Sequence, residues 1–145
     1  MRCIVTGGAG FIGSNLVDKL ISDGHEVIVF DDLSTGKEEN INPKAKLFKF
    51  DISKEEFFEI PIMEDIMTGV DVVFHMACLA RVQPSIEEPL LYHNKNVNGL
   101  VNMLEACRKY DVQRFVFSSS SSVYGDAEEV PTSENCKLNP MSPYA

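Results

Sequence analysis

The chain has no tryptophan, few basic residues and no long apolar segment. Its 13 lysines and arginines stand against 22 aspartates and glutamates, which gives a formal net charge of −9. This shortage of positive charge disfavours a nucleic-acid partner, because no basic patch would neutralise a phosphate backbone. No apolar run approaches the ~20 residues that span a bilayer, so we also expect no membrane segment.

The cysteines are scattered, with no CxxC pair and no Cys/His spacing of a metal site. We therefore interpret Cys3, Cys78, Cys107 and Cys136 as reduced thiols and predict no metal site. The N-terminus enters a predicted strand directly, without the features of a signal peptide. The expected location is accordingly the cytoplasm.

A glycine-rich turn between a strand and a helix is the main feature that the chain does contain. Residues 3–5 form a short apolar run typical of a buried strand, and apolar residues recur at helical spacing from Phe11 to Ile21. In a nucleotide-binding βαβ unit, Gly7 would allow the tight reversal, Gly10 would leave room for a diphosphate, and Gly13 would bring the helix close to the strand. The helix N-terminus would direct its free N–H groups at the phosphates. The alternative is a simple glycine turn.

A second apolar strand, residues 27–30, ends at Asp31 and Asp32. Asp31 follows the glycine turn by roughly 20 positions, where a carboxylate can accept hydrogen bonds from an adenosine ribose. A negative charge at this place repels a 2′-phosphate, so the sequence favours NAD over NADP. The alternative interpretation is a solvated aspartate at the end of a strand.

Further strands are predicted at residues 46–50, 70–77 and 114–118, with helical stretches between them. Five strands with helical crossovers predict an α/β fold with a doubly wound parallel sheet, a Rossmann fold, in the strand order 3-2-1-4-5. His75 lies in the fourth of these strands, and we interpret it as a core residue rather than a catalyst.

The stretch between the third and fourth predicted strands predicts a weak helix, and the stretch between the fourth and fifth predicts a strong one. Residues 54–67 carry a capping box of Ser53 and Glu56 and a break at Pro61. Residues 84–110 predict the longest helix, which Pro89 could divide.

We expect most of the apolar surface of this longest helix to pack on the sheet, and a stripe this wide could also serve a subunit interface. Its main stripe consists of Leu90, Val97, Val101 and Leu104, with Leu100, Met103 and Cys107 beside it. Asparagine is a poor residue within a helix, so at least one of Asn94, Asn96, Asn98 and Asn102 is expected to make a specific contact.

Seven segments, spread over the whole chain, match one known family in order. They are TGGAGFIG (6–13), DDLSTG (31–36), DI (51–52), HMACLA (75–80), NVNG (96–99), SSSSSVYG (118–125) and SPYA (142–145). On these segments the chain resembles the extended short-chain dehydrogenases/reductases, especially the UDP-glucose 4-epimerase-like nucleotide-sugar enzymes. The resemblance implies an NAD site that includes Phe11, Ile12, Asp31, Asp32, Leu33, Ser34, Thr35, Gly36, Asp51, Ile52, Met76, Ala77, Cys78, Leu79, Ala80 and Asn96. Asp51 would face the adenine.

The same resemblance implies two catalytic residues. Ser120 matches the catalytic Ser/Thr position, and Tyr144 matches the tyrosine of the family's YxxxK motif. Tyr144 would take the proton of the sugar 4-hydroxyl, and Ser120 would hydrogen-bond the reacting oxygen. The implied activity is NAD-dependent 4-epimerisation of a nucleotide-diphosphate sugar, a UDP-hexose, by a homodimer.

Two departures from the family pattern affect the prediction. Ser121 and Ser122 stand where dehydratases of the family carry an acidic pair, which disfavours dehydratase and decarboxylase activity. The chain also ends one residue after Tyr144. We therefore expect residues 1–145 to be an incomplete Rossmann domain, without the later strands, the motif lysine and the sugar-nucleotide domain, and we predict no useful epimerase activity from these residues alone.

Because the chain ends one residue after Tyr144, part of the 90–107 stripe should also be exposed, and we expect the chain to self-associate. Two alternatives stay open for the function. One is a dehydratase, decarboxylase or reductase of the same family, and the other is a non-catalytic NAD-binding module.

Overall fold

A parallel sheet is the centre of the molecule. The structure, a computed structural model, describes residues 1–54, 57, 60–127 and 129–145. The strands of the sheet are β1 (Arg2–Thr6), β2 (Glu26–Phe30), β3 (Lys46–Phe48), β4 (Val72–His75) and β5 (Arg114–Phe117). They lie in the order β3-β2-β1-β4-β5, which confirms the predicted doubly wound sheet and its strand order.

The inner strands are buried on both faces, as their continuous apolar sequences require. Cys3 on β1 pairs with Val27 on β2 and with Val72 on β4, and all three side chains are buried. β3 and β4 are shorter than predicted. The N–H of Phe50 donates to the carbonyl of Phe48 at 3.0 Å, so the chain turns there and leaves the sheet edge.

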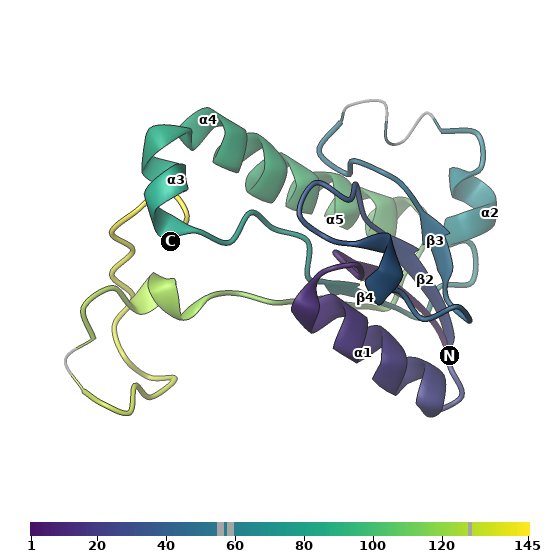
Figure 1. The fold of residues 1–145 in the computed structure, drawn as a ribbon, viewed down its shortest axis with the longest axis horizontal. Helices are drawn as coiled ribbons and strands as arrows, with labels where there is room; N and C mark the ends of the chain where they lie inside the picture. Colours follow the sequence, from purple (N-terminus) through teal and green to yellow (C-terminus); the bar gives the residue numbers. More distant parts are fainter. Residues whose placement is uncertain (55–56, 58–59, 128) are drawn as a thin grey trace.

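Helices cover both faces of the sheet (Figure 1). α1 (Phe11–Ser22) packs on one face through Val17 and Leu20. α2 (Met63–Met67) and α5 (Gly99–Lys109) pack on the other face. Of the weak helix predicted over 54–67, α2 is the helix that the structure describes, and it begins after Pro61. Four residues of the earlier part, among them Glu56 of the predicted capping box, lie outside the described part of the chain.

The long stretch predicted as one helix is divided into four segments. They are α3 (Val82–Glu87), α4 (Pro89–Tyr92), the π-helical turn η3 (His93–Asn98) and α5. The first break lies at Glu88, which has φ −127° and ψ 58°, because a residue before proline avoids helical geometry. Pro89 thus divides the helix as predicted, and the stretch begins at Val82 rather than at Pro84.

The prediction that most of this apolar surface packs on the sheet was wrong for the main stripe, although Met103 and Cys107 beside it are buried. Leu90 is 84% exposed, and Val97, Val101 and Leu104 are exposed as well. The face of α5 that packs on the sheet is formed by Gly99, Met103, Ala106 and Cys107. Gly99 lies against Ile52, which follows β3, and a Cβ on Gly99 would lie 3.3 Å from the Ile52 side chain. The glycine therefore allows a close contact there, and the bulky stripe of the same helical stretch is exposed.

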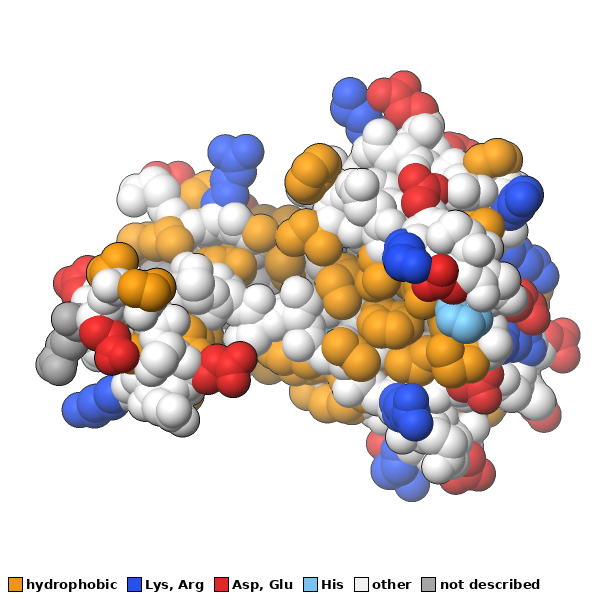
Figure 2. All heavy atoms as spheres, turned by 90° about the horizontal axis from the view of Figure 1, so that it is seen from below, with side chains coloured by type: hydrophobic (Ala, Val, Ile, Leu, Met, Phe, Trp, Pro, Cys, Tyr) orange, Lys and Arg blue, Asp and Glu red, His pale blue; other side chains and the backbone are white. Residues whose placement is uncertain are grey.

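The residues after β5 leave the sheet and return to the helical layer. The segment passes through η4 (Ser121–Tyr124), and near its end the N–H of Tyr144 donates to Ser85 Oγ at 3.1 Å. Figure 2 shows the face on the side of α1, where apolar side chains gather across the middle. The edge strand β5 contributes exposed apolar residues, including Val116 and Phe117. Within the described residues, no helix is both long enough and apolar enough to cross a membrane.

Candidate functional site

The glycine turn after β1 brings the N-terminus of α1 against two other strands. Gly7 has φ +69°, and its N–H donates to the carbonyl of Phe30 at 2.8 Å. A Cβ on Gly7 would lie 2.7 Å from the backbone nitrogen of Ala77, and a Cβ on Gly13 would collide with the carbonyl of Gly7. These contacts agree with the tight reversal predicted for Gly7 and the close helix packing predicted for Gly13.

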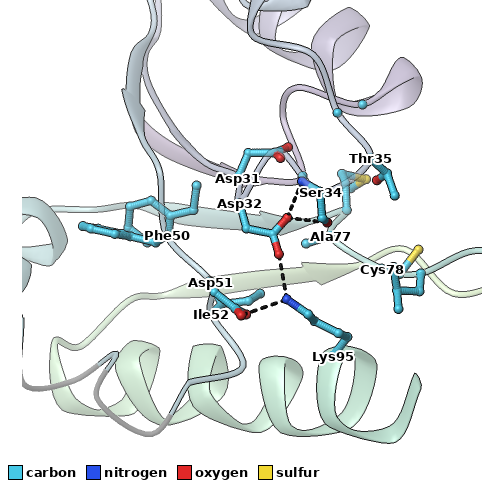
Figure 3. A pocket seen from close by; sticks show the side chains of 16 residues that line it. Asp31, Asp32, Ser34, Thr35, Phe50, Asp51, Ile52, Ala77, Cys78 and Lys95 are labelled. Atoms are coloured by element: carbon cyan, nitrogen blue, oxygen red, sulfur yellow. Dashed lines mark hydrogen bonds and ion pairs between the residues drawn. The ribbon is translucent and has the colours of Figure 1, made fainter. Parts of the chain in front are cut away.

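A pocket opens at the carboxyl ends of β1, β2, β3 and β4 (Figure 3). This is the position where open parallel sheets bind ligands, at the point where the strand order reverses. Its lining residues are Gly7, Gly10, Phe30, Asp31, Asp32, Ser34, Thr35, Gly36, Phe50, Asp51, Ile52, Met76, Ala77, Cys78, Leu79 and Lys95. No side chain caps α1 at Gly10, and its first turn carries no acidic residue. The positive end of this helix is therefore open to an anion.

Asp31 joins the glycine turn to the loop after β2. Its side chain is buried, Oδ2 accepts a hydrogen bond from the N–H of Ala9 at 2.9 Å, and Oδ1 accepts one from the N–H of Leu33 at 2.8 Å. A carboxylate has about four acceptor positions, so Asp31 keeps capacity for ligand hydroxyls. The aspartate predicted from its spacing thus lines the pocket and also fixes its shape.

Lys95 on η3 bridges two further carboxylates of the pocket (Figure 3). Its Nζ lies 2.7 Å from Asp32 Oδ2 and 2.8 Å from Asp51 Oδ2. The other oxygens of the two carboxylates accept hydrogen bonds from Ser34 and Ser53, respectively.

These contacts shift the pKa values of all three charged groups. Burial raises the pKa of Asp32 and of Asp51, but the hydrogen bonds from Lys95 and from the serines outweigh it and hold both pKa values below the usual range. Burial lowers the pKa of Lys95, and its bonds to the two carboxylates outweigh that effect and raise it. The bridge is therefore fully charged at neutral pH.

His75 lies behind the pocket rather than in it. Its side chain is buried, stacks against Phe115 and Phe117, and has Nδ1 3.1 Å from Thr6 Oγ1. Burial lowers its pKa to about 4. The prediction of a core histidine is confirmed.

Most residues predicted for the cofactor line this pocket, but six do not: Phe11, Ile12, Gly13, Leu33, Ala80 and Asn96. Phe11 is 85% exposed at the start of α1. Asn96 instead binds the backbone of Leu79, with its amide donating to the carbonyl at 3.1 Å and its Oδ1 accepting the N–H at 2.8 Å. This bears out the expectation that one of the helical asparagines makes a specific contact.

The two predicted catalytic residues lie on the segment after β5. Tyr144 lines a second, largely apolar hollow together with His93, Asn96, Val97 and Phe117. Ser120 lies at the start of η4, where its Oγ accepts the N–H of Ser122 at 3.2 Å. Ser120 lines neither of these two pockets.

The sequence reasoning missed Phe30, Phe50 and Lys95 as pocket residues. Phe30 and Phe50 immediately precede the predicted Asp31 and Asp51, so the ends of the strands carried a signal for them. Nothing local marked Lys95, because its partners lie 63 and 44 positions away in the chain.

The described residues offer donors and acceptors but no metal centre. No group of three or more His, Cys, Asp or Glu residues in that part is placed to hold a metal ion, and the four cysteines are unpaired. The pocket combines an open helix N-terminus for an anion with carboxylates for hydroxyl and amino groups. A dinucleotide fits this set, because its diphosphate and its adenosine present these two kinds of group.

Comparison with known proteins points in the same direction. Residues 3–145 match the sequence model of the NAD dependent epimerase/dehydratase family. A UDP-glucose 4-epimerase of Mycolicibacterium smegmatis is 43% identical over 152 aligned residues, which cover 100% of this chain and 47% of that protein. The chain spans just under half the length of the curated relatives it matches.

Solved structures show the same similarity. A UDP-glucose 4-epimerase of Thermus thermophilus in complex with NAD superposes with a TM-score of 0.90 at 40% identity, covering 99% of this chain and 46% of that one. A UDP-glucose 4-epimerase of Thermotoga maritima with UDP-glucose superposes with a TM-score of 0.89 at 44% identity, again covering 99% and 46% of the two chains.

Proposed function

The chain belongs to the NAD dependent epimerase/dehydratase family, and from this premise we propose that it is the NAD-binding part of an enzyme that epimerises a UDP-sugar at C4. The residues that support this proposal are those of the pocket at the end of α1. The relatives that it matches are named UDP-glucose 4-epimerases, and two solved relatives carry NAD or UDP-glucose.

The single observation that carries the proposal is the side-chain-free gap between Gly7 and Gly10 at the open N-terminus of α1. A Cβ on Gly10 would meet only the carbonyl oxygen of Gly7, at 3.3 Å, and otherwise open space. Free N–H groups and the helix dipole would hold the diphosphate there. Asp31, Asp32 and Asp51 would then accept hydrogen bonds from the adenosine. Residues 76–79 would border the nicotinamide half of the cofactor.

Residues of the second hollow would serve the sugar. When bound, NAD supplies a reversible hydride acceptor for the sugar C4–H. Tyr144 would accept the proton of the 4-hydroxyl through its phenolic oxygen and later return it, and Ser120 would hydrogen-bond the same sugar oxygen. The similarity in sequence supports these two roles. Tyr144 also lines the same hollow as Asn96, whose side chain binds the backbone of Leu79, and this supports its nearness to the cofactor path.

A homodimer is part of this proposal. Val101 and Leu104 of the stripe are exposed and lie outside the lining of the second hollow, and exposed apolar residues at helical spacing favour association. Sedimentation equilibrium of the protein and of its Val101→Glu variant tests the point. The proposal predicts that the variant dissociates; a wild-type protein that stays monomeric at high concentration contradicts it.

The activity is tested by following the conversion of UDP-glucose to UDP-galactose by the protein that carries this chain. We expect Tyr144→Phe to lose turnover by at least about a hundredfold, which is typical for the loss of a general acid–base group, and to keep its affinity for NAD. The matched control is Tyr110→Phe at the end of α5, which should keep turnover. A product that has lost water would instead identify a dehydratase, and NAD binding without any turnover would identify a binding module.

A further inference from the structure

Lys95 lies where three elements of the dinucleotide pocket meet. Its side chain extends from η3 to Asp32, after β2, and to Asp51, after β3 (Figure 3). Only 23% of the Lys95 side chain is exposed, with 26% for Asp32 and 22% for Asp51. Such shielded pairs are screened much less than the surface pairs elsewhere on the molecule.

The carboxylates mark the adenosine side of the pocket. A diphosphate is repelled by carboxylates and belongs at the N-terminus of α1, between Gly7 and Gly10. The ribose hydroxyls and the exocyclic amine of adenine are donors, which carboxylates accept. The adenosine half of a dinucleotide therefore lies beside Asp32 and Asp51, and Lys95 determines how these two groups are spaced.

The neighbouring residue in the same turn serves the opposite wall. Asn96 holds both backbone polar groups of Leu79, which follows β4. Consecutive residues of one turn thus fix the loops after three strands. The wide backbone of the π-helical turn, a geometry that recurs at functional sites, carries both side chains.

We propose that Lys95 is a positioning residue for the adenosine half of the cofactor: its ammonium ties the carboxylates of Asp32 and Asp51 and keeps them charged and correctly separated for the ligand. Without the lysine, the two adjacent carboxylates would repel each other, and one of them would be protonated at a higher pH than in the wild-type protein. This inference rests on the proposed function, since it assumes that the pocket takes a dinucleotide.

The test compares the affinities for NAD and for AMP, measured by calorimetry on the wild-type protein, Lys95→Gln and Lys49→Gln. Lys49 is the matched control, because it also forms a lysine–carboxylate pair, with Glu38 at 2.7 Å, but on the exposed surface. We expect Lys95→Gln to lower the affinity for NAD and the affinity for AMP by the same factor of about ten. This is the effect of removing one partner of a partly buried charge pair. Lys49→Gln should change both affinities by less than about twofold.

The pH profile separates positioning from a merely structural role. The titratable groups that face the pocket are Asp31 and Asp32 after β2, Asp51 after β3, Cys78 after β4 and Lys95 on η3. The wild-type affinity should stay flat from about pH 8 to about pH 5 because Lys95 keeps the pKa of both bridged carboxylates low. In Lys95→Gln the affinity should fall further toward pH 5, because one unpaired carboxylate is protonated there and no longer accepts hydrogen bonds as a charged group.

Three results would overturn the inference: unchanged affinities in Lys95→Gln, a loss for NAD without an equal loss for AMP, or a loss that does not vary with pH. If the Gln variant does not fold, Lys95→Arg replaces it. Arginine keeps donors for both carboxylates, so it should bind NAD within about threefold of wild type, and a larger loss would contradict the inference. Failure of the wild-type protein to bind either ligand would contradict the proposed function itself.

Discussion

Replacing Thr6 by valine tests the hydrogen bonds that hold the β4 loop against the glycine turn. Thr6 is fully buried, and its Oγ1 accepts hydrogen bonds from the N–H groups of Met76, at 3.2 Å, and Ala77, at 3.1 Å. Both lone pairs of the hydroxyl are thereby used, so its proton points to Nδ1 of His75, 3.1 Å away. We therefore assign the proton of the neutral imidazole to Nε2.

The magnitude follows from counting what valine would leave unpaired. The N–H of Met76 also donates to the carbonyl of Thr6 at 3.2 Å, so it keeps a partner. The N–H of Ala77 and Nδ1 of His75 would each lose the bond to the hydroxyl. A fully buried polar group left unsatisfied costs about 1–3 kcal/mol, and the N–H of Ala77 is only partly buried, so Thr6→Val should lower the free energy of unfolding by somewhat less than twice that cost, about 2–5 kcal/mol.

Urea denaturation of the wild-type protein and the variant measures this change. The control is Thr132→Val, since the Thr132 hydroxyl donates to the carbonyl of Glu129 on the surface, where substitution should change the free energy of unfolding by less than about 0.5 kcal/mol. Thr6→Val combined with His75→Phe should recover part of the loss, because the orphaned nitrogen is removed as well. A loss below about 1 kcal/mol for Thr6→Val alone would refute the reasoning.

Two other predictions follow from the same region. Gly13→Ala should lower the free energy of unfolding by about 1–3 kcal/mol and lower the affinity for NAD, because the new Cβ would collide with the backbone carbonyl of Gly7. An unchanged affinity for NAD in calorimetry would contradict the close packing of α1. Burial lowers the pKa of His75 to about 4, so the unfolded chain binds a proton that the folded protein does not, and stability should fall by about 3 kcal/mol as the pH drops from about 6.5 to 4. Denaturation curves of His75→Phe should lack this part of the pH dependence, and an unchanged dependence would show that His75 is not its source.

The sheet could be predicted from the sequence because its signals are local. A short, continuous apolar run such as residues 27–30 is typical of a strand buried on both faces of a parallel sheet. The glycine turn and helix that follow residues 3–5 indicate a parallel crossover. The aspartates at the ends of these strands then lie at one edge of the sheet, which explains why most of the predicted cofactor residues line one pocket.

The packing of the last helix and the role of Lys95 could not be predicted in this way. A helix with two adjacent apolar faces does not reveal which of them meets the sheet, and here the face with Gly99, Met103 and Cys107 does so. Lys95 acquires its function only when β2, β3 and η3 come together. A charged residue with distant partners carries no periodic or local signal.

The most direct measurement of the central claim is a calorimetric titration of the chain with NAD and with NADP. A gap at the tip of α1 that holds a diphosphate, with Asp31 beside the ribose, predicts one NAD site per chain and weaker binding of NADP. No heat of binding with NAD, or tighter binding of NADP, would contradict the claim.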